Sequence, residues 1–281
     1  MCTEPPKEPD GDCGGSIQHE VTESSITYFD ITATIAPELP TWDSGTGLGQ
    51  GACVKTKDMS KGDNCYASFL SMSAHTGTHI DMPSHFSPQA MLDGKTAEKT
   101  DLGLLMGPVL VIEVPYGSNI TAPVLKALDI APEATRVIFK TDSTSKGLMQ
   151  RTAFESSYTG LTATGAKFLA DNTHIKTVGI DYLSVGIYEE CAEAHMELFK
   201  KDIMVVEGLV LEGVPPGWYS MTCLPLKVLG AEGVPARCIL TEYLDGNSRI
   251  SDEDDDDLDM WSDGEDLFQE GGYYENYEEL Y

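Results

Sequence analysis

Short apolar runs rich in β-branched residues recur through the middle of the chain, and turn-forming residues separate them. Runs of this length between turn residues are typical of buried strands. The first run, residues 28–33, is followed by a loop with Pro37, Pro40 and Gly45 that carries Trp42. Further strands are predicted at residues 65–74, 109–114, 137–140, 178–181, 203–206, 218–224 and 236–243.

Three segments between these strands are predicted to be helices, at residues 122–128, 164–171 and 192–200. Pro123 falls in the first turn of the first segment, where a helix tolerates proline because the missing N–H would have no partner there. Strands that alternate with helices imply an α/β domain with mixed sheets and flanking helices.

Composition places one folded domain at residues 26–245. The chain has 281 residues and 41% apolar content, which is enough to bury a substantial core. The leader at residues 1–25 is acidic, poor in apolar side chains and interrupted by proline and glycine. The tail at residues 246–281 is dominated by Asp and Glu, and no Lys or Arg follows Arg249. We expect the leader and the tail to be disordered.

The overall charge excludes several classes of partner. A formal net charge of -28 argues against binding to nucleic acid or to an anionic membrane surface. No apolar run is long enough to span a bilayer, and no signal peptide is visible, which favours the cytoplasm and leaves secretion of a processed chain open. Seven cysteines without a CxxC spacing indicate neither a disulfide framework nor a cysteine zinc site.

The densest chemistry lies at residues 73–85, where His75, His79, Asp81 and His85 stand close together. Imidazole and carboxylate groups are the ligands that zinc and manganese prefer, so a metal site is the first hypothesis. The spacing of His75 and His79 would also suit one face of a helix. Gly77 between them and the β-branched residues around it favour an irregular turn that aims the side chains at one point.

The pattern HxGTHxDxPxH, from His75 to His85, resembles the signature of the cyclase-like metal-dependent hydrolases, which include bacterial kynurenine formamidase and isatin hydrolase. The resemblance implies a swivelling β/β/α fold. It also implies that His75, His79 and Asp81 bind one metal ion, that Asp81 reaches a second ion, and that His85 is catalytic.

The second metal ion needs ligands of its own, and the resemblance assigns them to His195 and Glu207, twelve residues apart as in that family. Taken alone, a helical histidine followed by a glutamate at the end of a strand is more often a packing and surface pair. With the ligands that the resemblance assigns, the chain is expected to bind two divalent ions, zinc or manganese. His19 and His174 lie in polar surroundings and are expected at the solvated surface.

The resemblance further places Trp42 in the substrate pocket, although a tryptophan that anchors its loop is an equal alternative. Tyr66 offers a second ring contact, and Asp43 stands where the bacterial pattern has proline. The expected partner is a small-molecule amide substrate, without nucleic acid or membrane. The resemblance implies that the chain forms a homodimer or homotetramer.

These expectations combine into the hydrolysis of an amide. The resemblance alone implies N-formylkynurenine as the leading substrate, with kynurenine and formate as products. Hydrolysis of a cyclic amide such as isatin is the first alternative. A metal-stabilised binding or regulatory protein that uses its acidic, tyrosine-rich tail for contacts is the second. His85 discriminates between catalysis and binding, because a closed structural metal site needs no spare acid or base beside it.

Overall fold

The computed structural model describes residues 27–242 of the chain. The predictions for the leader at residues 1–25 and for the tail at residues 246–281 fall outside the described residues, as does His19. Among the helices that the structure describes, none has the length and apolar character needed to cross a membrane.

The centre of the domain is one sheet of eight strands in the order β1-β10-β4-β8-β7-β6-β5-β9. Because β9 also pairs with β10, the sheet closes on itself. Strands β5 to β8 run parallel to one another, and the remaining pairings are antiparallel, so the sheet is mixed. The strands are β1 (Tyr28–Asp30), β4 (His79–Asp81), β5 (Met106–Glu113), β6 (Arg136–Lys140), β7 (Thr177–Ile180), β8 (Met204–Glu207), β9 (Gly217–Pro225) and β10 (Gly233–Glu242).

Both faces of the parallel strands β6, β7 and β8 are buried. Ile138 and Val206 belong to the apolar cluster inside the closed sheet. Val137, Phe139 and Val205 belong to the cluster under the helices. Successive side chains of a strand point to opposite faces, so a strand with two buried faces is apolar throughout. This explains why the sequence shows continuous β-branched runs here.

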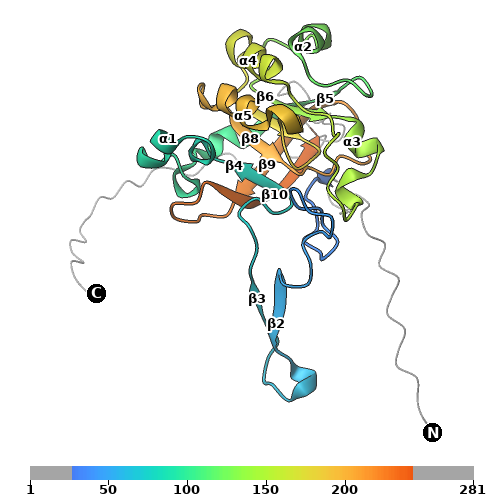
Figure 1. Cartoon of the computed structure of the whole chain (residues 1–281), viewed down its shortest axis with the longest axis vertical. Helices are drawn as coiled ribbons and strands as arrows, with labels where there is room; N and C mark the ends of the chain where they lie inside the picture. Colours follow the sequence, from blue (N-terminus) through green and yellow to red (C-terminus); the bar gives the residue numbers. More distant parts are fainter. Residues whose placement is uncertain (1–26, 243–281) are drawn as a thin grey trace, which may run out of the picture. The chain divides into compact units, whose positions relative to one another are not determined.

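Helices α2 (Ala122–Leu128), α4 (Ala163–Asn172) and α5 (Cys191–Phe199) lie on one side of the sheet, where Figure 1 draws them together. Helix α2 has the predicted bounds, and α4 and α5 differ from the predicted segments by one residue at each end. The prediction of an α/β fold with a mixed sheet is confirmed. The remaining helical segments are short: α1 (Pro88–Leu92), α3 (Asp142–Ser145), and the 3-10 turns η1 (Met59–Lys61), η2 (Pro83–His85), η3 (Ala97–Lys99), η4 (Leu102–Leu104), η5 (Leu148–Gln150) and η6 (Tyr188–Glu190).

The predicted strand at residues 65–74 is wrong in extent and in place. Only β3 (Ala67–Leu70) is extended, and it pairs with β2 (Cys53–Lys57), a strand that no prediction covers. We call residues 53–70 the arm. Every residue of β2 is exposed, and the arm forms a separate two-stranded sheet (Figure 1). The run of small and apolar residues therefore reflects an exposed hairpin, not a strand of the main sheet.

The cysteine spacing indicates no disulfide framework, yet the structure contains a disulfide. Cys223 on β9 and Cys238 on β10 are directly opposite in the antiparallel register, and they form a disulfide in the buried core. Nothing in their spacing of 15 residues signals this pairing, because it depends on the register of two strands.

Gly165 in α4 tests the packing of the helices. A methyl group at this position would overlap the carbonyl oxygen of Ile120. Alanine normally favours a helix by about 1 kcal/mol over glycine, but overpacking a buried site costs about 1–3 kcal/mol. We expect Gly165→Ala to lower the free energy of unfolding in urea. Gly51→Ala, where the added methyl group meets no heavy atom within 4 Å, is the control and should leave stability nearly unchanged.

Candidate active site

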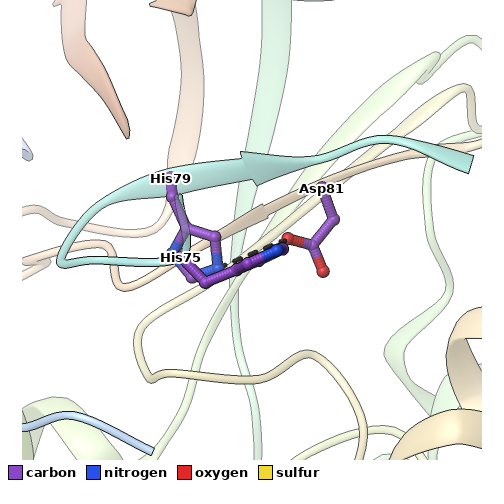
Figure 2. A group of neighbouring side chains, drawn as sticks. All are labelled: His75, His79 and Asp81. Carbon is purple, nitrogen blue, oxygen red and sulfur yellow. Dashed lines mark hydrogen bonds and ion pairs between the residues drawn. The ribbon is translucent and has the colours of Figure 1, made fainter. Parts of the chain in front are cut away.

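Strand β4 positions two of the predicted ligands. It lies between β10 and β8, and its register sets His79 opposite Glu207. His79 and Asp81 are two residues apart and share one face of the strand, while Ile80 points into the core. Figure 2 shows the imidazoles of His75 and His79 turned toward the carboxylate of Asp81. The predicted turn is confirmed for the residues before His79, but His79 and Asp81 lie on a strand.

The turn that carries His75 is fixed by hydrogen bonds at its base. Gly77 has φ 64°, a left-handed conformation that favours glycine. The Thr78 hydroxyl donates to the carbonyl oxygen of Gly208 over 2.6 Å and accepts from the backbone N–H of Ala33 over 2.7 Å. Gly208 directly follows Glu207 in the chain, so one threonine ties together the two segments that deliver ligands.

The side chain of Asp81 lies between a pair of histidines on one side and a third histidine on the other. Its Oδ1 is 2.8 Å from Nδ1 of His75 and 3.4 Å from Nε2 of His79. Its Oδ2 is 3.3 Å from Nε2 of His195, which comes from α5. Glu207, at the end of β8, has its two oxygens 2.9 Å from Nε2 of His195 and 3.3 Å from Nε2 of His79. It thereby completes a circle of five side chains, those of His75, His79, Asp81, His195 and Glu207. The structure thus brings together all five predicted ligands.

Two sets of three residues within this circle could hold a metal ion. One set is His75, His79 and Asp81, and the other is Asp81, His195 and Glu207; within each, the ligand atoms lie within 4.8 Å of one another. Asp81 belongs to both sets. In the part of the chain that the structure describes, no lysine or arginine pairs with either carboxylate. Nitrogen and oxygen donors of this kind fit zinc or manganese.

Outer hydrogen bonds leave the inward-facing atoms available for ligation. His79 donates from Nδ1 to the carbonyl oxygen of Gly77 over 2.9 Å, and His195 donates from Nδ1 to that of Cys191 over 2.7 Å. Both rings therefore present an unprotonated Nε2 to the centre of the site when they are neutral. Oε1 of Glu207 also accepts from the backbone N–H of Val185 over 2.6 Å.

Without a metal ion, the buried groups depend on one another for charge balance. Burial disfavours the charged form of His79, but hydrogen bonds with Asp81 and Glu207 outweigh it and raise the pKa of His79 to about 10. Burial likewise opposes ionisation of Asp81, yet hydrogen bonds from His195, His75 and His79 hold the pKa of Asp81 well below its usual value. The raised pKa of His79 and the lowered pKa of Asp81 thus have one cause, the hydrogen bonds within this buried group.

His85 lies beside this circle and belongs to neither set that contains Asp81. It ends the 3-10 turn η2, and its ring stacks on that of His75 with 4.1 Å between the centroids. Burial lowers the pKa of His85 below its usual value, so the imidazole is neutral at pH 7. A neutral imidazole that lies outside the two sets sharing Asp81 can accept a proton.

These side chains line a pocket of about 580 Å³. Trp42 lies at the pocket and also packs on Tyr188 and Phe154, with ring centroids 5.6 and 4.9 Å away, so it both lines the pocket and anchors its loop. Tyr66 is not among the lining residues in the described chain; it lies in the arm and is 60% exposed, so the expectation of a ring contact from Tyr66 is wrong.

The residue after Trp42 fixes the conformation of the loop beside the pocket. Asp43 has φ 56°, a conformation closed to proline, whose ring holds φ near −65°. Its carboxylate accepts a hydrogen bond from the hydroxyl of Tyr188, with both oxygens at 3.1 Å. This hydrogen bond ties the loop of Trp42 to η6 at the pocket.

Comparisons with known proteins agree with this geometry. The family model described as "Putative cyclase" matches residues 29–186. The chain belongs to the cyclase family. Cyclase-like protein 1 of Arabidopsis thaliana is 43% identical over 225 residues, which cover 80% of this chain and 88% of that protein. Kynurenine formamidase of Maricaulis maris (strain MCS10) is 30% identical over 215 residues, or 76% of this chain and 97% of that protein.

Solved structures give the same result. A structure described as a potential metal-dependent hydrolase with cyclase activity has a TM-score of 0.64 and 30% identity, and covers 79% of this chain and all of its own. Isatin hydrolase A from Labrenzia aggregata has a TM-score of 0.62 at 19% identity, covering 77% of this chain and 94% of its own, and shows the fold alone. This member of the cyclase family is therefore a metal-dependent hydrolase by family, and the resemblance noted in the sequence is confirmed.

In the metal-free protein, the pKa values of the stacked pair His75 and His85 should be shifted in opposite directions. Burial lowers the pKa of His85, whereas the hydrogen bond with Asp81 outweighs burial and raises that of His75. In an NMR titration we expect the His85 ring signals to shift at a pH below the ordinary histidine value of about 6.5 and those of His75 to shift above it. His85→Ala assigns the His85 signals, and the reverse order would contradict this electrostatic picture.

Proposed function

We propose that this cyclase-family protein hydrolyses an aryl formamide of the N-formylkynurenine type, with two divalent metal ions, zinc or manganese, as cofactors. One observation carries the proposal: Asp81 belongs to both candidate metal sets, and His85 stacks beside them without belonging to either. The identity of 30% with bacterial kynurenine formamidases supports the substrate class.

The roles of the residues follow from their places. His75 and His79 would hold one ion and His195 and Glu207 the other, with Asp81 between them. Divalent ions in such a site supply Lewis-acid activation of a carbonyl group and of water. The donor set fits them, because the buried carboxylates of Asp81 and Glu207 are otherwise balanced only by imidazoles among the described residues.

His85 supplies the proton transfers. Its neutral imidazole can take a proton from the attacking water as the new C–O bond forms. The same imidazole can then donate this proton to the amine nitrogen as the C–N bond breaks, which releases the amine and formate. His85 returns to its neutral form at the end of the cycle, so a single side chain serves as base and as acid.

The pocket wall suits an aromatic amino acid derivative. The stacked rings of Trp42 and Tyr188 offer a flat apolar surface for an aryl group. Glu189 and Glu193 also line the pocket, and their carboxylates would pair with the ammonium group of such a substrate. These features support the formamide over a small uncharged ring such as isatin.

A direct assay tests the substrate class. The purified chain is loaded with zinc or manganese, and N-formylkynurenine and isatin are followed by absorbance with and without a chelator. We expect turnover of N-formylkynurenine to exceed that of isatin and to stop when the metal is removed. Turnover of isatin alone would favour the cyclic amide. Metal binding without turnover of either compound would favour a metal-stabilised binding or regulatory protein.

Two variants separate proton transfer from metal binding. His85→Ala should retain the metal content of the wild type, measured by mass spectrometry, and lose about 10²–10⁴-fold in kcat because general acid–base catalysis contributes that much. Asp81→Ala should lose metal as well as activity, because both sets share this carboxylate. Full activity of His85→Ala would refute the proposed role of His85.

A further inference from the structure

Glu232 lies against the metal centre but outside both sets that share Asp81. Its Oε1 is 3.3 Å from Nε2 of His75, while Nδ1 of the same ring is 2.8 Å from Oδ1 of Asp81. The two nitrogens of one imidazole therefore face two carboxylates. Glu232, His75 and His85 form a third set of possible ligands, with ligand atoms within 4.8 Å of one another, but this set is less buried than the two that share Asp81. The carboxylate therefore lies beside the stacked pair.

The backbone around Glu232 is built for this approach. The carbonyl oxygen of Glu232 accepts a hydrogen bond from the N–H of Met82 over 2.9 Å, and Gly233 pairs with Asp81 across β10 and β4. A Cβ atom on Gly233 would overlap Cε1 of His75 and lie 2.8 Å from its Nε2. The imidazole thus lies flat against a glycine, and the residue before that glycine holds the outer edge of the ring.

His75 differs from the other two histidines in the atom that it offers. His79 and His195 donate from Nδ1 to carbonyl oxygens and present Nε2 to the centre. His75 presents Nδ1 to the centre, so its proton must lie on Nε2 when the ring is neutral and ligates through Nδ1. Nε2–H then needs an acceptor outside the circle, and the carboxylate of Glu232 is its hydrogen-bond partner.

We propose that Glu232 is a positioning residue that accepts the Nε2–H of His75, fixes the tautomer that leaves Nδ1 free for the metal ion, and holds the ring on which His85 stacks. This inference rests on the metal site of the proposed function and adds a residue to it. A carboxylate that receives the outer N–H of a ligating histidine orients the ring and increases its basicity. The side chain of Glu232 is 40% accessible, so its carboxylate contacts both solvent and the outer nitrogen of the His75 ring.

The test measures metal affinity by competition with a coloured chelator, independently of turnover. Loss of an outer partner of this kind typically costs about 10–100-fold in metal affinity, and we expect that loss for Glu232→Ala. Glu232→Gln keeps an oxygen that can accept the N–H and should recover most of the affinity. Glu133→Ala removes the same charge from an exposed loop between α2 and β6 and should bind as the wild type does.

Each result bears on the inference. Gly233→Ala, which displaces the His75 ring without removing a carboxylate, should also weaken binding, and the melting temperature of each metal-free variant shows whether it is folded. Wild-type affinity in a folded Glu232→Ala would overturn the inference, and so would equal losses in Glu232→Ala and Glu232→Gln. A wild-type chain that binds no metal would instead refute the proposed function itself.

Discussion

The buried carboxylate of Asp81 is the interaction on which the rest of the site depends. It touches three imidazoles from three separate segments, the turn before β4, β4 itself and α5. Removing one member of such a group leaves an uncompensated charge in the interior, which is far more costly than losing an ion pair at the surface. The turn, the strand and the helix are therefore coupled energetically through one side chain.

The closed sheet makes this convergence possible. Strand β4 has only three residues, but it is paired on both edges, to β10 and to β8. A short strand held from two sides has little freedom to twist or slide, so His79 and Glu207 stay opposite each other. The apolar clusters on the two faces of the sheet support this small polar centre, and the helix α5 brings His195 to it from the outer layer.

Much of this arrangement could be predicted from the sequence because its signals are local. The β-branched runs identify β5 to β8, Pro123 marks the start of α2, and the pattern from His75 to His85 points to candidate ligands through a family resemblance. Strand β4 could not be predicted, because three residues are too few to show an alternating pattern. The contacts of Glu232 and the disulfide Cys223–Cys238 could not be predicted either, because they depend on the register of β10, which no local pattern encodes.

The two ways in which this chain uses extended backbone have different consequences for its evolution. In β4, a single inserted or deleted residue would shift the strand by one position, which exchanges its two faces. Ile80 would then face the pocket, and the side chains of His79 and Asp81 would face the apolar core. In the arm, which pairs only with itself, the hairpin can gain or lose residues in pairs without moving any ligand. Length variation within such a lineage should thus collect in the arm, and the three residues of β4 should keep their spacing.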